Sequence, residues 1–283
     1  MTTDHAAVAA DDLDVLVPCS YRMGDYWTSG TASFAPDRFT AKAVEAAVPG
    51  TARAARAAAD FEVRVLEYLA GAGIAQVLHL GHGYPYAPAV TGVLGWEVVQ
   101  QHIPGAPVVM VCTNRRVYTL NEALVHADAP VVTLCRDRLG PEVLDDPQVR
   151  AVLDPDRPLA VLLTSVHRQH PAPDLPALVA GLTARMAPGS LLALSHLAAG
   201  GRRTRRWLTR SMRQATRGRW GRVLAPCDLA KLLLGMERVG SRPGDVAAWS
   251  ADGRTPPPAA HLPTEGGRAP AVVEYGGLAR IRT

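Results

Sequence analysis

Short apolar segments that alternate with helical segments restrict the fold of this chain more than any other feature. Two examples are residues 107–112 (PVVMVC) and 159–166 (LAVLLTSV), which are apolar at nearly every position. Such continuous apolar character is expected of strands that are covered on both faces, whereas a strand with one solvated face alternates. The repeated β-α-β order therefore predicts an α/β fold with a doubly wound, mostly parallel sheet.

Each predicted element is delimited by its pattern and by glycine or proline at its ends. The strands share short apolar runs and are predicted at 76–80, 107–112, 130–134, 159–166, 190–195 and 271–275. The helices share helical spacing of apolar or alanine residues and are predicted at 37–48, 51–70, 87–100, 117–127, 141–153, 175–186 and 226–236.

The length of 283 residues suits one large α/β domain with an N-terminal extension. We predict a disordered tail at 1–20, an N-terminal helical segment at 21–72, and the α/β domain at 73–283. Residues 251–270, rich in proline and glycine, are predicted to form a surface loop. There is no run of about 18 apolar residues and no signal-peptide pattern, so we expect a cytoplasmic protein without a membrane span.

The cysteines give no sign of a metal site. They are widely spaced and form no C-x-x-C pair, which predicts neither a zinc site nor a disulfide framework. They are Cys19, Cys112, Cys135 and Cys227.

An arginine-rich segment at 201–222 (GRRTRRWLTRSMRQATRGRWGR) contains nine arginines and no acidic residue. Arginines neutralise phosphates and tryptophans stack on bases, so Trp207 and Trp220 make this segment a candidate contact for nucleic acid. An acidic protein partner fits equally well. The alternative is a solvated helix face, since only two of the 30 basic residues of this chain are lysines and arginine is abundant in it.

A glycine turn follows the first predicted strand, in the stretch VLHLGHGYP at 77–85. Gly81 permits a tight turn, and the start of a following helix would offer free N–H groups to a ligand. The full G-x-G-x-x-G pattern is absent because Tyr86 occupies its last position, which disfavours a dinucleotide-binding fold. His79 and His82 flank the turn either as a repurposed base or ligand site, or as tolerated replacements in an altered pocket.

Several stretches, taken in order, resemble one known family. They are RMGDYWTSGTASFAPDR (22–38), GIAQVLHLGHGYP (73–85), PGSLLALSH (188–196), GRVLAPCDLAKLLLGMERVGSRPGDVAAWSAD (221–252) and YGGLARI (275–281). Together they resemble an actinobacterial family of S-adenosylmethionine-dependent methyltransferases, formerly a domain of unknown function. The resemblance implies a class I methyltransferase fold in which the N-terminal helices form a lid over the cofactor.

The resemblance also implies where the cofactor would bind. Gly81 and Gly83 would shape the turn against the methionine part, Cys112 and Asn114 would face the ribose, and Asp137 would face the adenine edge. The implied cofactor site consists of Tyr26, His79, Gly81, His82, Gly83, Cys112, Asn114 and Asp137. No catalytic residue is identified.

This chain departs from the family pattern at the acidic positions of that site. His79 stands where the family has aspartate, His82 where it has threonine, and Cys112 where it has the acid that accepts both ribose hydroxyls. Hydrogen bonds to charged acceptors are worth about 1.5–3 kcal/mol, and cysteine is a poor acceptor. Each lost bond is expected to weaken adenosine binding by about tenfold or more.

Two functional hypotheses therefore remain. The first is an S-adenosylmethionine-dependent methyltransferase that acts on an unknown small-molecule or macromolecular acceptor. The second is a catalytically inactive protein that keeps the methyltransferase fold and binds an acidic partner or nucleic acid through residues 201–222.

Overall fold

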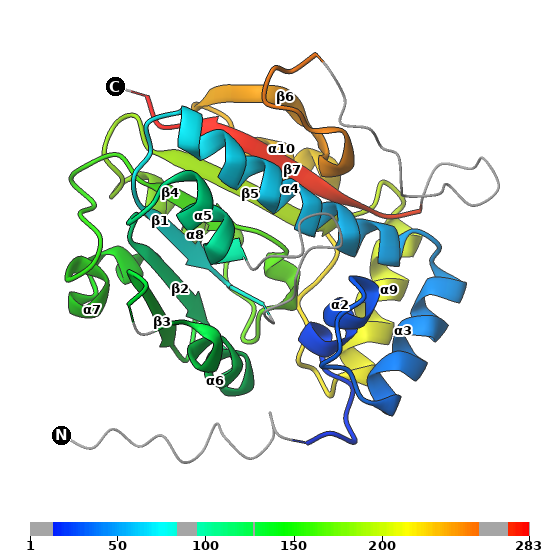
Figure 1. Ribbon diagram of the computed structural model, residues 1–283. Helices are drawn as coiled ribbons and strands as arrows, with labels where there is room; N and C mark the ends of the chain where they lie inside the picture. The colour runs from blue at the N-terminus through cyan, green and yellow to red at the C-terminus, as the bar shows by residue number, and fades with distance from the viewer. Residues whose placement is uncertain (1–13, 84–94, 127, 255–270, 283) are drawn as a thin grey trace.

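The computed structural model describes residues 14–83, 95–126, 128–254 and 271–282. These residues form a sheet between two layers of helices, with a further group of helices at one end (Figure 1). The strands are β1 (Val77–Leu80), β2 (Val108–Cys112), β3 (Val131–Cys135), β4 (Ala160–Leu163), β5 (Leu191–Ala198), β6 (Glu237–Asp245) and β7 (Val273–Arg280). The helices are α2 (Ser20–Trp27), α3 (Ala35–Ala47), α4 (Thr51–Gly71), α5 (Gly95–His102), α6 (Arg115–Leu124), α7 (Pro147–Arg150), α8 (Leu175–Thr183), α9 (Arg202–Ala215) and α10 (Pro226–Leu232), with short 3-10 helices η1 (Pro141–Asp145), η2 (Val166–Arg168) and η3 (Val246–Ala248).

The sheet has the strand order β3-β2-β1-β4-β5-β7-β6. β1 to β5 are parallel to one another, whereas β7 runs antiparallel to both β5 and β6. Val77 of β1 is paired on one side with Val108 of β2 and on the other with Ala160 of β4, so the strand order reverses between β1 and β4. A reversal of this kind leaves a crevice beyond the carboxyl ends of the strands, where ligands bind in open α/β sheets.

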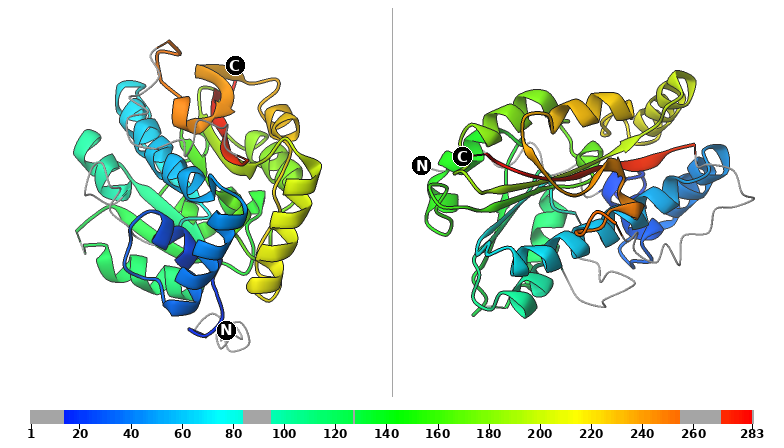
Figure 2. Two further views of the ribbon diagram at one scale, coloured as in Figure 1. Left: turned by 90° about the vertical axis from the view of Figure 1, so that its right-hand side faces the viewer. Right: turned by 90° about the horizontal axis from the view of Figure 1, so that it is seen from above.

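Helices cover both faces of the sheet (Figure 2), and each face packs into its own hydrophobic core. Leu78 of β1 packs in the core that contains residues of α8 and α10, whereas Val77 packs in the core that contains residues of α4 and α5. Side chains two residues apart along a strand share a face. His79 is therefore directed to the same side as Val77, toward α4.

The N-terminal helices form a third cluster with the arginine-rich helix. Met23 of α2, Val44 of α3 and Leu208 of α9 lie in one buried core. Residues 14–19, grouped with the tail in the sequence analysis, precede α2, and the Val17 carbonyl accepts a 2.6 Å hydrogen bond from Arg22 Nη2. Residues 1–13 lie outside the described residues.

Class I methyltransferase topology and an N-terminal helical region are both present, as the sequence predicts. The predicted strand at 159–166 is too long, because Ser165 adopts a φ of +50° and the chain enters η2. The predicted helix at 141–153 is wrong as a single element. Asp146 separates η1 from α7, and its carboxylate accepts a 2.8 Å hydrogen bond from the Gln148 amide at the start of α7.

Strand β6 was not predicted from the sequence. Gly240, Pro243 and Gly244 interrupt any strand pattern, and the pairing of β6 with β7 is irregular between Val239 and Gly244. An edge strand tolerates proline because one side of its backbone needs no partner. The start of the predicted helix at 87–100 and most of the predicted loop at 251–270 fall outside the described residues. None of the helices within the described ranges is long and apolar enough to cross a bilayer.

Candidate functional site

The glycine turn after β1 lies at the sheet edge where the strand order reverses. Gly81 has a φ of +82°, a left-handed conformation that favours glycine. The Val111 carbonyl of β2 accepts hydrogen bonds from the Gly81 amide at 2.8 Å and from the His82 amide at 3.1 Å. The turn is thus fixed to the neighbouring strand, and the absence of a side chain at Gly81 leaves a space above it.

The side chain of Gln169 fills that space. Its Nε2 donates to the Gly81 carbonyl at 2.6 Å, and its Oε1 accepts from the Tyr21 hydroxyl at 2.6 Å and from Thr113 Oγ1 at 3.1 Å. A Cβ added to Gly81 would lie 2.7 Å from Gln169 Nε2. Gln169 is completely buried, so its amide ties together the segments after β1, β2 and β4 and helix α2.

His79 and His82 form a buried pair beside the turn. Their Nδ1 atoms are 3.1 Å apart, and His82 Nε2 is 2.7 Å from Asn121 Oδ1. Asn121 Nδ2 donates to the carbonyls of Gly83 and Val117, which makes its Oδ1 the acceptor. A neutral His82 therefore carries its proton on Nε2, and its Nδ1 accepts a hydrogen bond from His79.

Glu62 of α4 closes the other side of this pair. Its Oε1 is 3.5 Å from His79 Nδ1, and its Oε2 accepts a 2.9 Å hydrogen bond from Thr164 Oγ1. Burial lowers the pKa of His79 and of His82 to about 4, and burial raises the pKa of the Glu62 carboxyl. Both histidines are neutral at pH 7 and occupied by protein partners, which favours their interpretation as buried replacements rather than as a free base.

Cys112 and Asn114, the predicted ribose contacts, follow β2. Cys112 is 1% exposed, and its Sγ donates to the Asn114 carbonyl at 3.3 Å. Asn114 caps α6, since its Oδ1 accepts from the Val117 amide at 3.0 Å. The side-chain oxygen of Asn114 is thus already used in capping, and a ribose would meet its amide nitrogen.

An open cavity of about 330 Å³ lies between α2 and the carboxyl ends of β2, β3 and β4. Its volume falls within the usual range for small-molecule sites, about 300–1,000 Å³. Three loops and one helix contribute side chains that a bound molecule could contact. The lining includes Ser20, Tyr21 and Arg22 of α2, Thr113 and Asn114 after β2, Asp137 after β3, and Arg168, His170 and Pro171 after β4.

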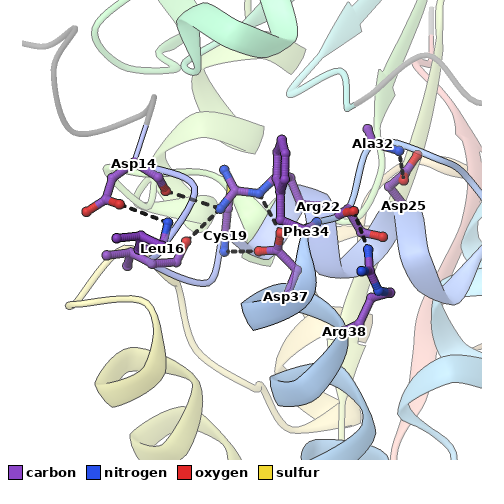
Figure 3. A network of polar contacts seen from close by, with 11 residues as sticks. Asp14, Leu16, Cys19, Arg22, Asp25, Ala32, Phe34, Asp37 and Arg38 are labelled. Carbon is purple, nitrogen blue, oxygen red and sulfur yellow. Dashed lines mark hydrogen bonds and ion pairs between the residues drawn. The ribbon is translucent and has the colours of Figure 1, made fainter.

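A network of polar contacts in the opening motif at 22–38 holds α2 in place (Figure 3), and α2 lines the cavity. Arg22 and Asp37 form a fully buried ion pair at 2.7 Å, and Asp37 also accepts from the amides of Cys19 and Phe34 at 2.8 Å each. Asp25 accepts from the Ala32 amide at 2.8 Å. Arg22, Asp25 and Asp37 thus have structural roles. Their contacts present one face of α2 to the cavity.

The arginine-rich segment combines a solvated face with a packed one. Arg205 Nη1 donates to the Ala199 carbonyl at 2.7 Å, and Arg213 Nε donates to the Trp220 carbonyl at 3.1 Å. Trp220 is 3% exposed and packs against His167, so its predicted role in base stacking is wrong. Trp207 is 44% exposed and remains available at the surface.

Residues 6–282 match the sequence model of the family described as S-adenosyl methyltransferase. The chain belongs to this family. No curated protein matches the chain. The resemblance inferred from the motifs is thereby confirmed over nearly the whole length of the protein.

Two solved structures of similar size share the fold of this family member. One is a putative methyltransferase from Thermobifida fusca, 26% identical, with a TM-score of 0.79 over 95% of this chain and 97% of the other. The second is a DUF574 family protein from Streptomyces avermitilis, 25% identical, with a TM-score of 0.76 over 94% of this chain and 98% of the other. Both matches span the N-terminal helices as well as the sheet.

The structure divides the predicted cofactor residues of this family member between two places. Asn114 and Asp137 line the open cavity, whereas His79, Gly81, His82 and Gly83 lie at the filled turn. Cys112 is buried beneath Asn114. Tyr26 is not in the cavity lining. Tyr21 takes this place, because residues five apart on a helix point about 140° apart.

Sequence reasoning missed Gln169, Arg168 and Glu62, the residues that distinguish this site. No local motif marks them, although Arg168 and Gln169 follow a predicted strand, where ligand contacts are expected. His167, which also follows β4, packs against His196 and Trp220. Across the described ranges, no three His, Cys, Asp or Glu side chains are arranged to hold a metal ion.

Proposed function

We propose that this protein is an S-adenosylmethionine-dependent methyltransferase whose cofactor enters the cavity between α2 and the strand ends. The proposal is carried by one observation, the 330 Å³ cavity beside the point where the strand order reverses. Family membership supports the cofactor class. The bound cofactor would supply an electrophilic methyl group, and the protein would supply the position of the acceptor, which by itself accounts for much of the rate in such transfers.

The residues present fit the adenosine half of this cofactor. Asp137 offers a carboxylate to the adenine amino group, and Asn114 offers an amide nitrogen to the ribose hydroxyls. Both side chains line the cavity, and Tyr21 lies across it on α2. The loss of an acid at Cys112 lowers the expected affinity.

The methionine half fits after one side chain has moved. In the described conformation the Gln169 amide occupies the space above Gly81, and three hydrogen bonds hold it there. A typical intramolecular hydrogen bond contributes about 0.5–1.5 kcal/mol net. A ligand that forms new hydrogen bonds in place of these three can therefore offset the free energy of rotating Gln169 away. Gln169 therefore lowers the cofactor affinity without abolishing it.

Calorimetric titration with S-adenosylhomocysteine and S-adenosylmethionine tests this assignment. We expect binding to the wild type, and about tenfold tighter binding to Gln169→Ala, because the ligand no longer displaces the amide and 1.4 kcal/mol corresponds to one decade. Gln214→Ala, on the exposed side of α9, is the matched control and should bind like the wild type. An absence of binding by both the wild type and Gln169→Ala at millimolar ligand would refute the proposal.

The second candidate is a catalytically inactive protein of the same fold that serves as a binding module. The observation that favours it is the filled glycine turn together with the replaced acids at His79 and Cys112. The same titration separates the two candidates. If the wild type and Gln169→Ala are both folded and neither binds the cofactor, the binding module is the better assignment.

A further inference from the structure

Arg168 is largely buried, and its guanidinium forms no ion pair with any of the described residues. It is 8% exposed and lines the open cavity. Its backbone carbonyl accepts a 3.0 Å hydrogen bond from Ser20 Oγ. No hydrogen bond or ion pair from its side chain is formed with any residue in the described ranges. A buried charge normally finds both hydrogen bonds and an opposite charge, because desolvation costs several kcal/mol.

The position of the guanidinium is fixed by packing rather than by polar contacts. It lies against Gly24 of α2, where an added Cβ would come within 2.8 Å of Arg168 Cζ and Nη1. Gly24 therefore makes room for the guanidinium between α2 and the sheet edge. An arginine that was merely tolerated at this position would be expected to turn outward to solvent along its flexible stem.

Buried carboxyls influence Arg168 only at longer range. Burial raises the pKa of the carboxyls of Asp25, Glu62 and Glu274, and the positive charge of Arg168 partly offsets this rise. None of the three forms an ion pair with Arg168. Each is engaged elsewhere, with Glu274 Oε1 accepting from Ser195 Oγ at 2.7 Å. Burial raises the pKa of Glu274 to about 7, so this carboxyl is only partly ionised at neutral pH. A bound anion would therefore supply the opposite charge that these carboxyls do not place in contact with Arg168.

Arg168 and Glu274 both line a small cavity of about 10 Å³. This is room for about one water molecule. Glu274 Oε2 is buried without a partner, so such a water would satisfy this oxygen and one Arg168 donor. A guanidinium has five donors in a planar fork. The remaining N–H donors of Arg168 are available to a molecule in the large cavity, which Arg168 also lines.

We propose that Arg168 binds an anionic group, a carboxylate or a phosphate, of the molecule that occupies the large cavity. The planar guanidinium matches both groups in bidentate geometry. Asp137 follows β3 and Arg168 follows β4, three strands away in the sheet order, or about 14 Å at about 4.8 Å per strand. The ligand is thus elongated, with a hydrogen-bond donor at the Asp137 end and a negative charge at the Arg168 end.

The site would serve either the methyl acceptor or the carboxylate of the cofactor itself. Only this choice of source rests on the proposed function. The anion site is defined by Arg168 and the cavity alone, so it is tested first with simple anions and no cofactor.

The test follows the Nε–H signals of arginine side chains by NMR during titration with inorganic phosphate, acetate or chloride at matched ionic strength. The Arg168 signal is identified by its absence from Arg168→Gln. We expect it to shift with phosphate and acetate but not with chloride. We also expect phosphate affinity to fall at least tenfold in Arg168→Gln and less in Arg168→Lys, which keeps the charge but loses the fork. Arg206→Gln, on the exposed face of α9, is the control and should retain the wild-type affinity.

A second arm identifies the source of the anion. Calorimetry compares S-adenosylhomocysteine, which has a carboxylate, with 5′-methylthioadenosine, which has none. If the anion belongs to the cofactor, Arg168→Gln weakens binding of the first ligand at least tenfold and leaves the second unchanged. If it belongs to the acceptor, both affinities are unchanged and phosphate still shifts the Arg168 signal in the presence of S-adenosylhomocysteine.

The inference is overturned if the Arg168 signal ignores phosphate, or if Arg168→Gln binds phosphate as the wild type does. Should Arg168→Gln fail to fold, Gly24→Ala replaces it, because the added Cβ displaces the guanidinium while every charge is kept. Gly24→Ala should lose phosphate binding, and unchanged binding would likewise overturn the inference. Failure of the proposed function is recognised separately, as absent binding of S-adenosylhomocysteine with phosphate binding intact.

Discussion

Two regions along one sheet edge differ in how their polar groups are satisfied. At the glycine turn, Gln169, His82 and Asn121 form hydrogen bonds with other protein groups. On either side of this turn, Asp137 after β3 and Arg168 after β4 line an open cavity. The same crevice of the fold thus contains a filled half and an open half.

This difference shows which half recognises a ligand in the described conformation. Buried polar groups that are paired stabilise a single packing, whereas unpaired ones carry a cost that a ligand removes. The filled half resembles a core and is expected to respond to mutation through stability. The open half is expected to respond through binding. Four substitutions test this division.

The largest effect is expected at the buried Arg22–Asp37 ion pair behind α2, whose polar groups are paired as in the filled half. Asp37→Asn removes the buried carboxylate that pairs with Arg22 and should lower the free energy of unfolding by about 3–5 kcal/mol. Urea denaturation measures this. Asp14→Asn, which breaks the 3.5 Å contact with the exposed Arg217, is the control and should cost at most about 1 kcal/mol. Similar costs for both variants would contradict the structural role of the Arg22–Asp37 pair.

A pH-dependent effect is expected in the filled half. Burial lowers the pKa of His82 from 6.5 to about 4. Between these two pH values the unfolded chain is protonated at His82 and the folded chain is not. Its contribution to stability is complete above pH 6.5 and is lost as pH falls toward 4, by about 1.4 kcal/mol per pH unit. His82→Gln should therefore lose less stability than the wild type between pH 7 and pH 4.5.

Urea denaturation at the two pH values measures this difference. His126→Gln is the control, because His126 is exposed and should leave the pH dependence as it is in the wild type. An unchanged slope in His82→Gln would mean that His82 is not the group that responds to acid.

A smaller loss is expected at the glycine turn itself. Gly81→Ala forces a side chain into a left-handed conformation, which costs about 1–2 kcal/mol, and brings its Cβ within 2.7 Å of Gln169 Nε2. Gly83→Ala is a matched control two residues away, because nothing lies within 4 Å of its added Cβ. Thermal unfolding should separate the two variants by several degrees. Equal melting temperatures would show that the turn is not packed as described.

The smallest effect on stability is expected on α9. Replacing Arg202, Arg203 and Arg206 by glutamine should change the free energy of unfolding by about 0.5 kcal/mol or less, because these side chains are exposed. If this face contacts nucleic acid, the slope of log affinity against log salt should fall by about 0.7–0.9 for each arginine removed. An unchanged slope would exclude such contact. Arg205 is left intact because it binds backbone carbonyls.

Much of the fold followed from local sequence. The apolar runs at 107–112 and 190–195 coincide with β2 and most of β5, since strands covered on both faces have few alternatives to burial. β6 escaped prediction because Gly240 and Pro243 break its pattern, and its extended form depends on pairing with β7. The residues of such a strand show little of the local sequence pattern from which a strand is predicted.

The site was predictable only in part. The glycine turn and the residues after β2 and β3 could be placed because parallel strands end at one sheet edge. The motif points to Tyr26 where Tyr21 lies, since one helix carries both and the motif does not reveal which face of it borders the cavity. Trp220 looked like a surface aromatic among arginines, yet it lies in the core beside His167.

The sequence by itself determined the alternation of β1 to β5 with helical segments, the glycine turn and membership of the S-adenosyl methyltransferase family. Burial periodicity and turn residues are local properties, so they are readable along the chain. Only the tertiary structure decided that Gln169 fills the space above Gly81 and that Arg168 forms no ion pair within the described ranges. Those two facts depend on contacts between residues 88 positions apart and on packing against Gly24 of α2, and no local pattern records them.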